Sequence, residues 1–319
     1  LPVVTDPLEA LESGAPIIHA EKQDNIIVHY ELHKGDAKSA LSSSQFSLER
    51  TYTTPLIEHA YMETEAVTAI PTLDGSQIEI VGSVQNPYTT RKIVAEVMGF
   101  PLSRIRIRQT TLGGSFGGKD DVMGILSARA AIAALKTSSP VTIRLDREES
   151  IRESYKRHPY IMRYKVGFDS EGKIHGMDID MIGDGGAYAS KSPLVTYRSF
   201  VQGTGPYEVE HVDINVRAVY TNNAYTGSMR GFGSPQPIFA QESLMDEVAL
   251  FLGKDPVQIR LVNGYRSGSV TATGQKLDNH EVNVIKVLET AAEQADFTSK
   301  WRKYLDESQP IDHSQGDLR

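Results

Sequence analysis

The segment 104–120 reads RIRIRQTTLGGSFGGKD and joins a strand-like stretch to a long helical one. Arg and Ile alternate over residues 104–108, which is typical of a half-buried strand. Residues 113–118 contain four glycines, and the apolar positions of 120–135 go most of the way round a helix. A strand, glycine loop and helix in this order direct backbone N–H groups and a helix dipole at an anion. This segment alone therefore predicts either a bound anion or cofactor, or a purely structural turn.

The elements around this segment predict an α+β fold with mixed sheets and packed helices. Asn86 is an expected N-cap, Pro87 stands at the first helical position and Gly99 ends that helix. We expect strands at 25–30, 46–53, 60–70, 77–81, 104–110, 141–145, 160–168, 173–182 and 212–220 and helices at 36–41, 86–98, 120–135, 235–252, 255–263 and 279–295. No regular βαβ rhythm is present, which disfavours a Rossmann or barrel fold. Residues 1–24 are expected to form a lead-in or linker, and residues 25–319 one domain, with two subdomains dividing near 140–150.

Composition excludes several classes of protein. The chain has 319 residues, 39% of them hydrophobic, so it can bury a sizeable core. Its 33 Lys and Arg against 41 Asp and Glu give a net charge of −8, which argues against a nucleic-acid partner. No apolar run approaches the roughly 18 residues of a membrane span, so we expect no membrane partner and a cytoplasmic location. Because it has no Cys, the chain cannot itself hold an iron–sulfur cluster, a disulfide or a thiol nucleophile.

A second glycine loop has the sequence SMRGFGSPQ at residues 228–236 and also leads into a helix. Arg230 and the helix start near Pro235 form a second corner suited to an anion. Taken alone, this loop is best explained as a helix entry with a surface Arg. Two such loops together favour a large anionic cofactor held from both sides.

Two other patterns suggest a ligand less strongly. Gly113, Gly118 and Lys119 match the spacing of a phosphate-binding P-loop, but Asp120 replaces the hydroxyl that would ligate magnesium. The nine His show no metal-binding spacing, and the Glu and His residues of 58–65 would alternate between the two faces of the expected strand. We therefore expect ordinary hydrogen bonding for residues 58–65. The charges of 147–153 are expected on a solvated helix face.

Five short motifs occur in series along most of the chain. They are EHAYME at 58–63, QNP at 85–87, GSFGGK at 114–119, RHP at 157–159 and RGFGSPQ at 230–236. In order and spacing, from about residue 20 to about residue 280, they resemble the molybdopterin-binding part of the xanthine dehydrogenase/aldehyde oxidase family. Each loop is weak evidence alone, but five at family spacing are specific.

The resemblance implies a molybdenum–molybdopterin cofactor, which in bacteria often carries a nucleotide, as in the cytosine dinucleotide form. Its metal takes sulfur from the pterin, which suits a chain without Cys. The residues matching the family's cofactor site are Gln85, Gly114, Phe116, Gly117 and Arg230. Of these, Gln85, Phe116 and Arg230 match the neighbourhood of the molybdenum. The Gln85 amide and the backbone N–H groups after Phe116 have donors suited to a metal oxo group.

The resemblance also implies a substrate site at Asp120, Arg198 and Phe232. Arg198 matches an arginine that faces a purine, Phe232 matches a ring that stacks on the heterocycle, and Asp120 stands where the family has a longer glutamate. Keeping a carboxylate and an arginine favours a purine-like N-heterocycle of the xanthine/hypoxanthine class over an aldehyde oxidase-type substrate. The implied reaction is oxidative hydroxylation with water as the oxygen source.

The implied catalytic glutamate lies in the family's C-terminal lobe, so we expect no catalytic residue in this chain and no activity from it alone. The expected partners are that C-terminal molybdopterin-binding lobe, an iron–sulfur subunit and an FAD subunit. Two rival hypotheses are a P-loop-like nucleotide-binding protein and a non-catalytic scaffold.

Overall fold

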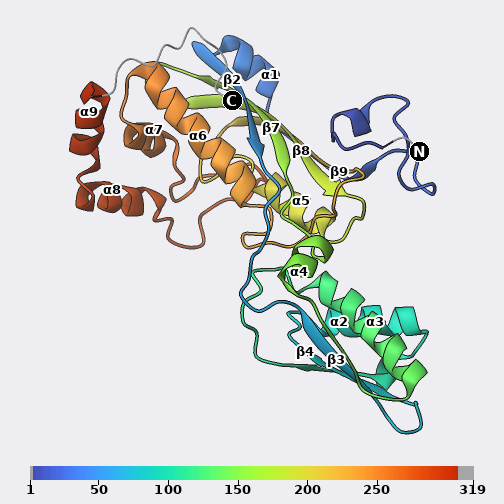
Figure 1. Ribbon diagram of the computed structural model, residues 1–319. Helices are drawn as coiled ribbons and strands as arrows, with labels where there is room; N and C mark the ends of the chain where they lie inside the picture. The colour runs from blue at the N-terminus through green and yellow to red at the C-terminus, as the bar shows by residue number, and fades with distance from the viewer. Residues whose placement is uncertain (1–2, 308–319) are drawn as a thin grey trace.

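The computed structural model describes residues 3–307 and confirms an α+β fold built on two mixed sheets (Figure 1). The larger sheet has five strands in the order β1-β9-β8-β7-β2, and its only parallel pair within the described residues is β8 with β9. In its register, Asp180 on β8 stands opposite Asn215 on β9 and Arg163 on β7. The bounds of its strands are β1 Ile26–Lys34, β2 Phe46–Thr54, β7 Tyr160–Phe168, β8 Ile174–Gly186 and β9 His211–Tyr220.

Helices cover both faces of the larger sheet. α6 (Pro235–Leu252) packs on the core face, where Leu244 and Met245 join Met162 and Tyr164 in one buried cluster. α5 (Ser192–Val201) contributes Phe200 to the same cluster. On the opposite face lies α1 (Ala37–Ser43), which approaches closely because β7 and β8 carry Gly167 and Gly176 beneath Ser44 and Ala40.

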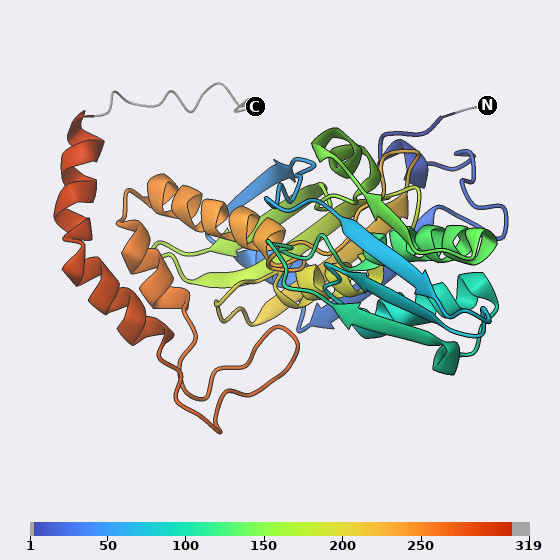
Figure 2. The same ribbon diagram turned by 60° about the horizontal axis from the view of Figure 1, so that its bottom comes forward.

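The smaller sheet has four strands in the order β5-β4-β3-β6. Their bounds are β3 Ala66–Pro71, β4 Ile78–Gly82, β5 Ile105–Gln109 and β6 Val141–Arg144. β4 and β5 are parallel and are joined through α2 (Pro87–Met98), which packs with α3 (Asp121–Thr137) over a second core. α3 comes close enough that a Cβ at Gly124 would lie 2.5 Å from Ile93 Cδ1. This sheet and its two helices stand apart from the larger sheet, with α4 (Arg147–Glu153) at the junction (Figure 1). Figure 2 turns the smaller sheet toward the viewer.

The smaller sheet is an insertion in the larger one. β1 and β2 precede it and β7 to β9 follow it, yet all five belong to one sheet. The expected division near 140–150 coincides with the end of β6 at Arg144. However, β1 and β2, which precede the smaller sheet in sequence, pair with β9 and β7 and so belong to the larger sheet. We therefore propose that the smaller unit comprises residues 66–144 rather than the whole first half of the chain. The remaining elements are η1 Glu9–Leu11, η2 Leu102–Arg104, α7 Pro256–Asn263, α8 Val284–Gln294 and α9 Phe297–Glu307.

Local sequence rules located most of the longer elements, but the bounds of some differ and a few elements were not expected. Asn86 caps α2 by accepting from Thr89 N at 3.2 Å, and Gly99 ends it at φ +64°. The strand expected over 60–70 begins only at Ala66, because the chain turns at Ala60 (φ +52°). α5 and α9 were not expected. In the lead-in, Val4 is buried and exchanges two hydrogen bonds with Asn222, so these residues pack on the body of the protein.

Candidate functional site

The glycine loop between β5 and α3 is held between two other segments of backbone. A Cβ at Gly118 would lie 2.5 Å from the Tyr61 ring, and one at Gly117 would lie 2.7 Å from Ser228 O. Gly117 also has φ +102°, a conformation that favours glycine. Close approach on both sides therefore explains why this loop is so rich in glycine, which a simple turn would not require.

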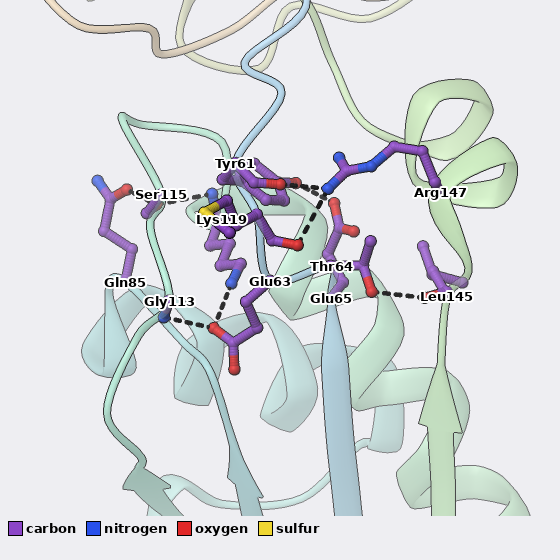
Figure 3. Close-up of polar contacts among 11 residues, drawn as sticks. Tyr61, Glu63, Thr64, Glu65, Gln85, Gly113, Ser115, Lys119, Leu145 and Arg147 are labelled. Carbon is purple, nitrogen blue, oxygen red and sulfur yellow. Dashed lines mark hydrogen bonds and ion pairs between the residues drawn. The ribbon is translucent and has the colours of Figure 1, made fainter.

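A partly buried ion pair, whose lysine is fully buried and whose glutamate is partly exposed, lies beneath the loop (Figure 3). Lys119 is 0% exposed, and its Nζ lies 2.6 Å from Glu63 Oε2, which also accepts from Gly113 N at 2.7 Å. Burial favours a higher pKa for Glu63, but the Lys119 ammonium and the Gly113 N–H hold that pKa below its usual value. Because its ammonium is occupied inside the protein, Lys119 does not project toward a phosphate. This position of Lys119 argues against the P-loop hypothesis, which requires the lysine to bind a phosphate.

The glycine loop and the neighbouring Gln85 side chain offer hydrogen-bond donors that the described part of the chain does not use. The Gln85 side chain is exposed, and its Oε1 accepts from Ser115 Oγ and from Gly117 N, the latter at 3.1 Å. Among the described residues we find no acceptor for the backbone N–H groups of Gly114, Ser115 and Phe116. Phe116 is half exposed at φ +53°. Three unpaired amides beside an exposed carboxamide suit an anionic, oxygen-rich ligand.

The second predicted loop contacts the first directly. Arg230 N donates to Phe116 O at 2.8 Å, and Arg157 Nη2 donates to Arg230 O at 2.8 Å. Phe232 follows at φ +49° and donates its N–H to Met229 O at 2.7 Å. All five residues predicted to bind the cofactor, namely Gln85, Gly114, Phe116, Gly117 and Arg230, thus belong to one continuous arrangement.

Two buried aromatic side chains support this arrangement and were missed from the sequence. His59 Nε2 donates to Ser228 O at 2.7 Å, and burial lowers the His59 pKa, so the ring is held neutral. Tyr155 OH donates to Gly117 O and accepts from Asp120 N at 3.2 Å. Their partners are distant in sequence, so no local spacing could have identified them. His59 lies in the EHAYME motif and Arg157 in the RHP motif, but neither motif indicates which backbone oxygen these side chains bind.

A family model for the molybdopterin cofactor-binding domain matches residues 18–264. The chain belongs to this family. It is 38% identical over 286 residues to the nicotinate dehydrogenase large molybdopterin subunit of Eubacterium barkeri, covering 90% of this chain and 66% of that protein. It is 34% identical over 326 residues to the xanthine dehydrogenase of Emericella nidulans, covering 94% of this chain and 24% of that protein. These matches confirm the xanthine dehydrogenase-type resemblance and the molybdenum–molybdopterin cofactor.

The fold agrees with this membership. The aldehyde oxidoreductase from Desulfovibrio gigas superposes with a TM-score of 0.88 at 25% identity, covering 97% of this chain and 33% of that one. This chain thus spans between about a quarter and two thirds of the length of these three proteins.

The residues predicted to bind substrate border the same loops. Asp120 is buried, its Oδ1 has no hydrogen-bond partner within the described chain, and its Oδ2 lies 3.5 Å from Ser228 Oγ. Burial raises the Asp120 pKa, with Lys191 opposing the shift. Arg198 is exposed on α5, which is tied to the second loop because Ser199 Oγ donates to Gly233 O at 2.8 Å. The roles of Asp120, Arg198 and Phe232 stay predictions.

Residues 58–65 make the ordinary hydrogen bonds that were expected of them, whereas residues 147–153 differ partly from expectation. Within residues 3–307, no group of three or more His, Asp or Glu is placed to hold a metal ion, and Glu63 and Glu65 instead accept hydrogen bonds from Lys119 and Tyr61. The solvated face expected for 147–153 is wrong for Arg147, whose guanidinium donates to Tyr61 O and Met62 O. The motif EHAYME is therefore a structural support of the loop. Over the same described range, no helix is long and apolar enough to cross a membrane.

Proposed function

We propose that this chain positions a molybdenum–molybdopterin cofactor and an N-heterocyclic substrate for oxidative hydroxylation by water. The observation that carries the proposal is the contact between the two glycine loops, which gathers three unpaired amides and the Gln85 carboxamide at one place. When bound, the cofactor supplies the two-electron oxidation of the substrate carbon. The chain's own residues bind and orient.

Gln85 is arranged to act as a donor. Its Oε1 accepts two hydrogen bonds from the loop, from Ser115 Oγ and Gly117 N, which fixes the orientation of the amide. Its Nε2 then points elsewhere and has no acceptor in the described part of the chain. A fixed amide N–H₂ beside the Gly114–Phe116 amides favours an oxo group of the cofactor as the partner. The nucleotide-bearing form of the pterin stays part of the proposal.

The substrate class rests on Asp120, Arg198 and Phe232. A buried carboxyl group with one unpartnered oxygen is suited to a hydrogen bond with a ring nitrogen or its N–H, and Arg198 offers an exposed guanidinium. These features favour a purine-like heterocycle of the xanthine/hypoxanthine class. Nicotinate, named for one relative, is also an N-heterocycle, and an aldehyde oxidase-type substrate is the alternative named for the structural neighbour.

The same proposal includes partners. We propose a second molybdopterin-binding lobe carrying the general base, together with iron–sulfur and FAD components that remove the electrons. The chain has no Cys with which to ligate such clusters itself. On this proposal the chain has no turnover on its own.

The experiment is metal and pterin analysis of the chain co-expressed and co-purified with the second lobe. We expect close to one molybdenum and one pterin per chain, and hydroxylation of xanthine or hypoxanthine once the redox components are present. A preparation with no molybdenum and tight ATP binding would support the P-loop alternative. One with neither ligand would support the scaffold.

A further inference from the structure

Glu63 binds both ends of the glycine loop at residues 113–119 through one carboxylate oxygen. Its Oε2 accepts from Gly113 N at 2.7 Å at the start of the loop and from Lys119 Nζ at 2.6 Å at the end (Figure 3). We propose that Glu63 is a positioning residue that clamps the Gly113–Lys119 loop and thereby sets the direction of its unpaired amides and of Gln85. This inference rests on the proposed cofactor role of that loop.

At the start of the loop, Glu63 and Gly113 contact each other twice. Glu63 N donates to Gly113 O at 3.2 Å, and Gly113 N donates back to the carboxylate. A Cβ at Gly113 would lie 2.5 Å from Glu63 Cβ, so only glycine permits this approach. The two residues therefore form a local two-way bridge. This bridge fixes the position of the chain at the point where the loop begins after β5.

At the end of the loop, the clamp depends on charge. The Lys119 ammonium is fully buried, and within residues 3–307 Glu63 is its only ion-pair partner. Glu63 is partly exposed, but Lys119 is not, so removing the Glu63 charge would leave a buried ammonium uncompensated, which is unfavourable. We therefore expect Lys119 to leave its site when Glu63 loses its charge.

Displacing Lys119 would also move Ser115 and Gln85, because both residues form hydrogen bonds with the Lys119 backbone. Lys119 N donates to Ser115 Oγ at 3.1 Å, and Lys119 O accepts from Gln85 N at 2.9 Å. Ser115 Oγ in turn donates to the Gln85 carboxamide. The clamp is thus connected to Gln85 through both the backbone and the side chain of the loop.

Glu63 itself is anchored outside the loop. Arg147 Nη2 donates to Tyr61 O and Met62 O, and Thr64 Oγ1 donates to Leu145 O at 2.7 Å. Leu145 N donates to Glu65 O at 2.9 Å, which extends the ladder of β3 and β6. Glu63 therefore connects the smaller sheet with the glycine loop. A carboxylate fixed on both sides is suited to positioning rather than to proton transfer.

The test uses the chain co-expressed with the second lobe and compares wild type, Glu63→Gln, and the double variant Glu63→Gln with Lys119→Met. Hydrogen exchange of peptides covering 113–119 and molybdenum per folded chain are measured. We expect Glu63→Gln to raise loop exchange by about tenfold or more and to lower molybdenum content several-fold. The double variant removes the buried charge, so it should recover thermal stability more fully than molybdenum content.

The matched control is Glu242→Gln. Glu242 also accepts from two donors, Tyr207 OH at 2.7 Å and Arg260 Nε at 2.8 Å, but it lies on α6. It should lower stability without changing loop exchange or molybdenum content. If Glu63→Gln behaves like Glu242→Gln, the clamp is wrong. If wild type itself contains no molybdenum, the cofactor proposal fails, while the exchange data still decide whether Glu63 orders the loop.

Discussion

The backbone N–H of Arg230 donates a 2.8 Å hydrogen bond to the carbonyl oxygen of Phe116, and this bond joins the two glycine loops. Both residues are exposed, so the joint lies at the surface where a ligand can reach it. The bond uses only main-chain atoms of the two residues. Their side chains therefore stay available for contact with a ligand.

Gly117→Ala should separate the two loops. The new Cβ would lie 2.7 Å from Ser228 O at a φ of +102°. Gly268→Ala is the control, because Gly268 has φ +89° and no heavy atom within 4 Å of its Cβ position. Both variants carry the cost of a positive φ, on the order of 1 kcal/mol. Steric overlap should add about 1–3 kcal/mol for Gly117→Ala alone, measured as the free energy of unfolding in urea. Equal losses in the two variants would show that overlap is unimportant.

Gln85→Met should reduce cofactor loading while leaving the fold intact. Because Gln85 is exposed, we expect the free energy of unfolding to change by less than about 1 kcal/mol. Molybdenum per chain should fall several-fold, since the carboxamide can no longer accept from Gly117 N or donate. Gln45→Met is the control: this exposed amide also accepts a backbone N–H, that of Ser170, at 3.1 Å. A similar molybdenum content in both variants would contradict the assignment.

Arg198→Met should change substrate preference. If the guanidinium stabilises charge that develops on a heterocycle, turnover of purines should fall by about tenfold or more, and turnover of aldehydes much less. The measurement is kcat/KM for both classes in the reconstituted enzyme. Arg106→Met, which removes an exposed arginine on β5, should affect neither class. Equal losses for purines and aldehydes in Arg198→Met would refute its assignment to substrate.

His158 should make the protein less stable as the pH falls. Burial lowers its pKa from 6.5 to about 3, so the folded state keeps the ring neutral while the unfolded state takes up a proton below pH 6.5. Its contribution to stability is therefore complete above pH 6.5 and is lost as the pH falls toward 3, by up to about 1.4 kcal/mol per pH unit.

The measurement is an NMR titration of the His158 ring, assigned by comparison with His158→Gln, together with unfolding at several pH values. The ring should keep its neutral chemical shift down to about pH 4. His158→Gln should weaken the acid dependence of unfolding. A ring that titrates near pH 6.5 in the folded protein would contradict this prediction.

Local rules predicted much of the fold because they depend on neighbouring residues. Asn86, Pro87 and Gly99 define α2 through capping and backbone preferences, and the alternation of 104–108 defines β5. α5 escaped prediction because it is held by tertiary contacts, such as Ser199 Oγ with Gly233 O, rather than by a periodic apolar face. The early part of the expected 60–70 strand is absent because the chain turns at Ala60, and Arg147, distant in sequence, donates to the carbonyl oxygens of Tyr61 and Met62 that follow this turn.

By itself, the sequence determined the α+β class, the two glycine loops and the motifs that indicate the cofactor family. Only the tertiary structure decided that Phe116 meets Arg230, that Glu63 pairs with Lys119, and that Asp120 Oδ1 finds no partner within residues 3–307. The physical reason is distance along the chain. Capping, turns and periodicity act between neighbours, whereas Lys119 and Glu63 are 56 positions apart and Arg230 and Phe116 are farther apart still. No local spacing specifies such contacts, so they form only when segments distant in the sequence come together in the fold.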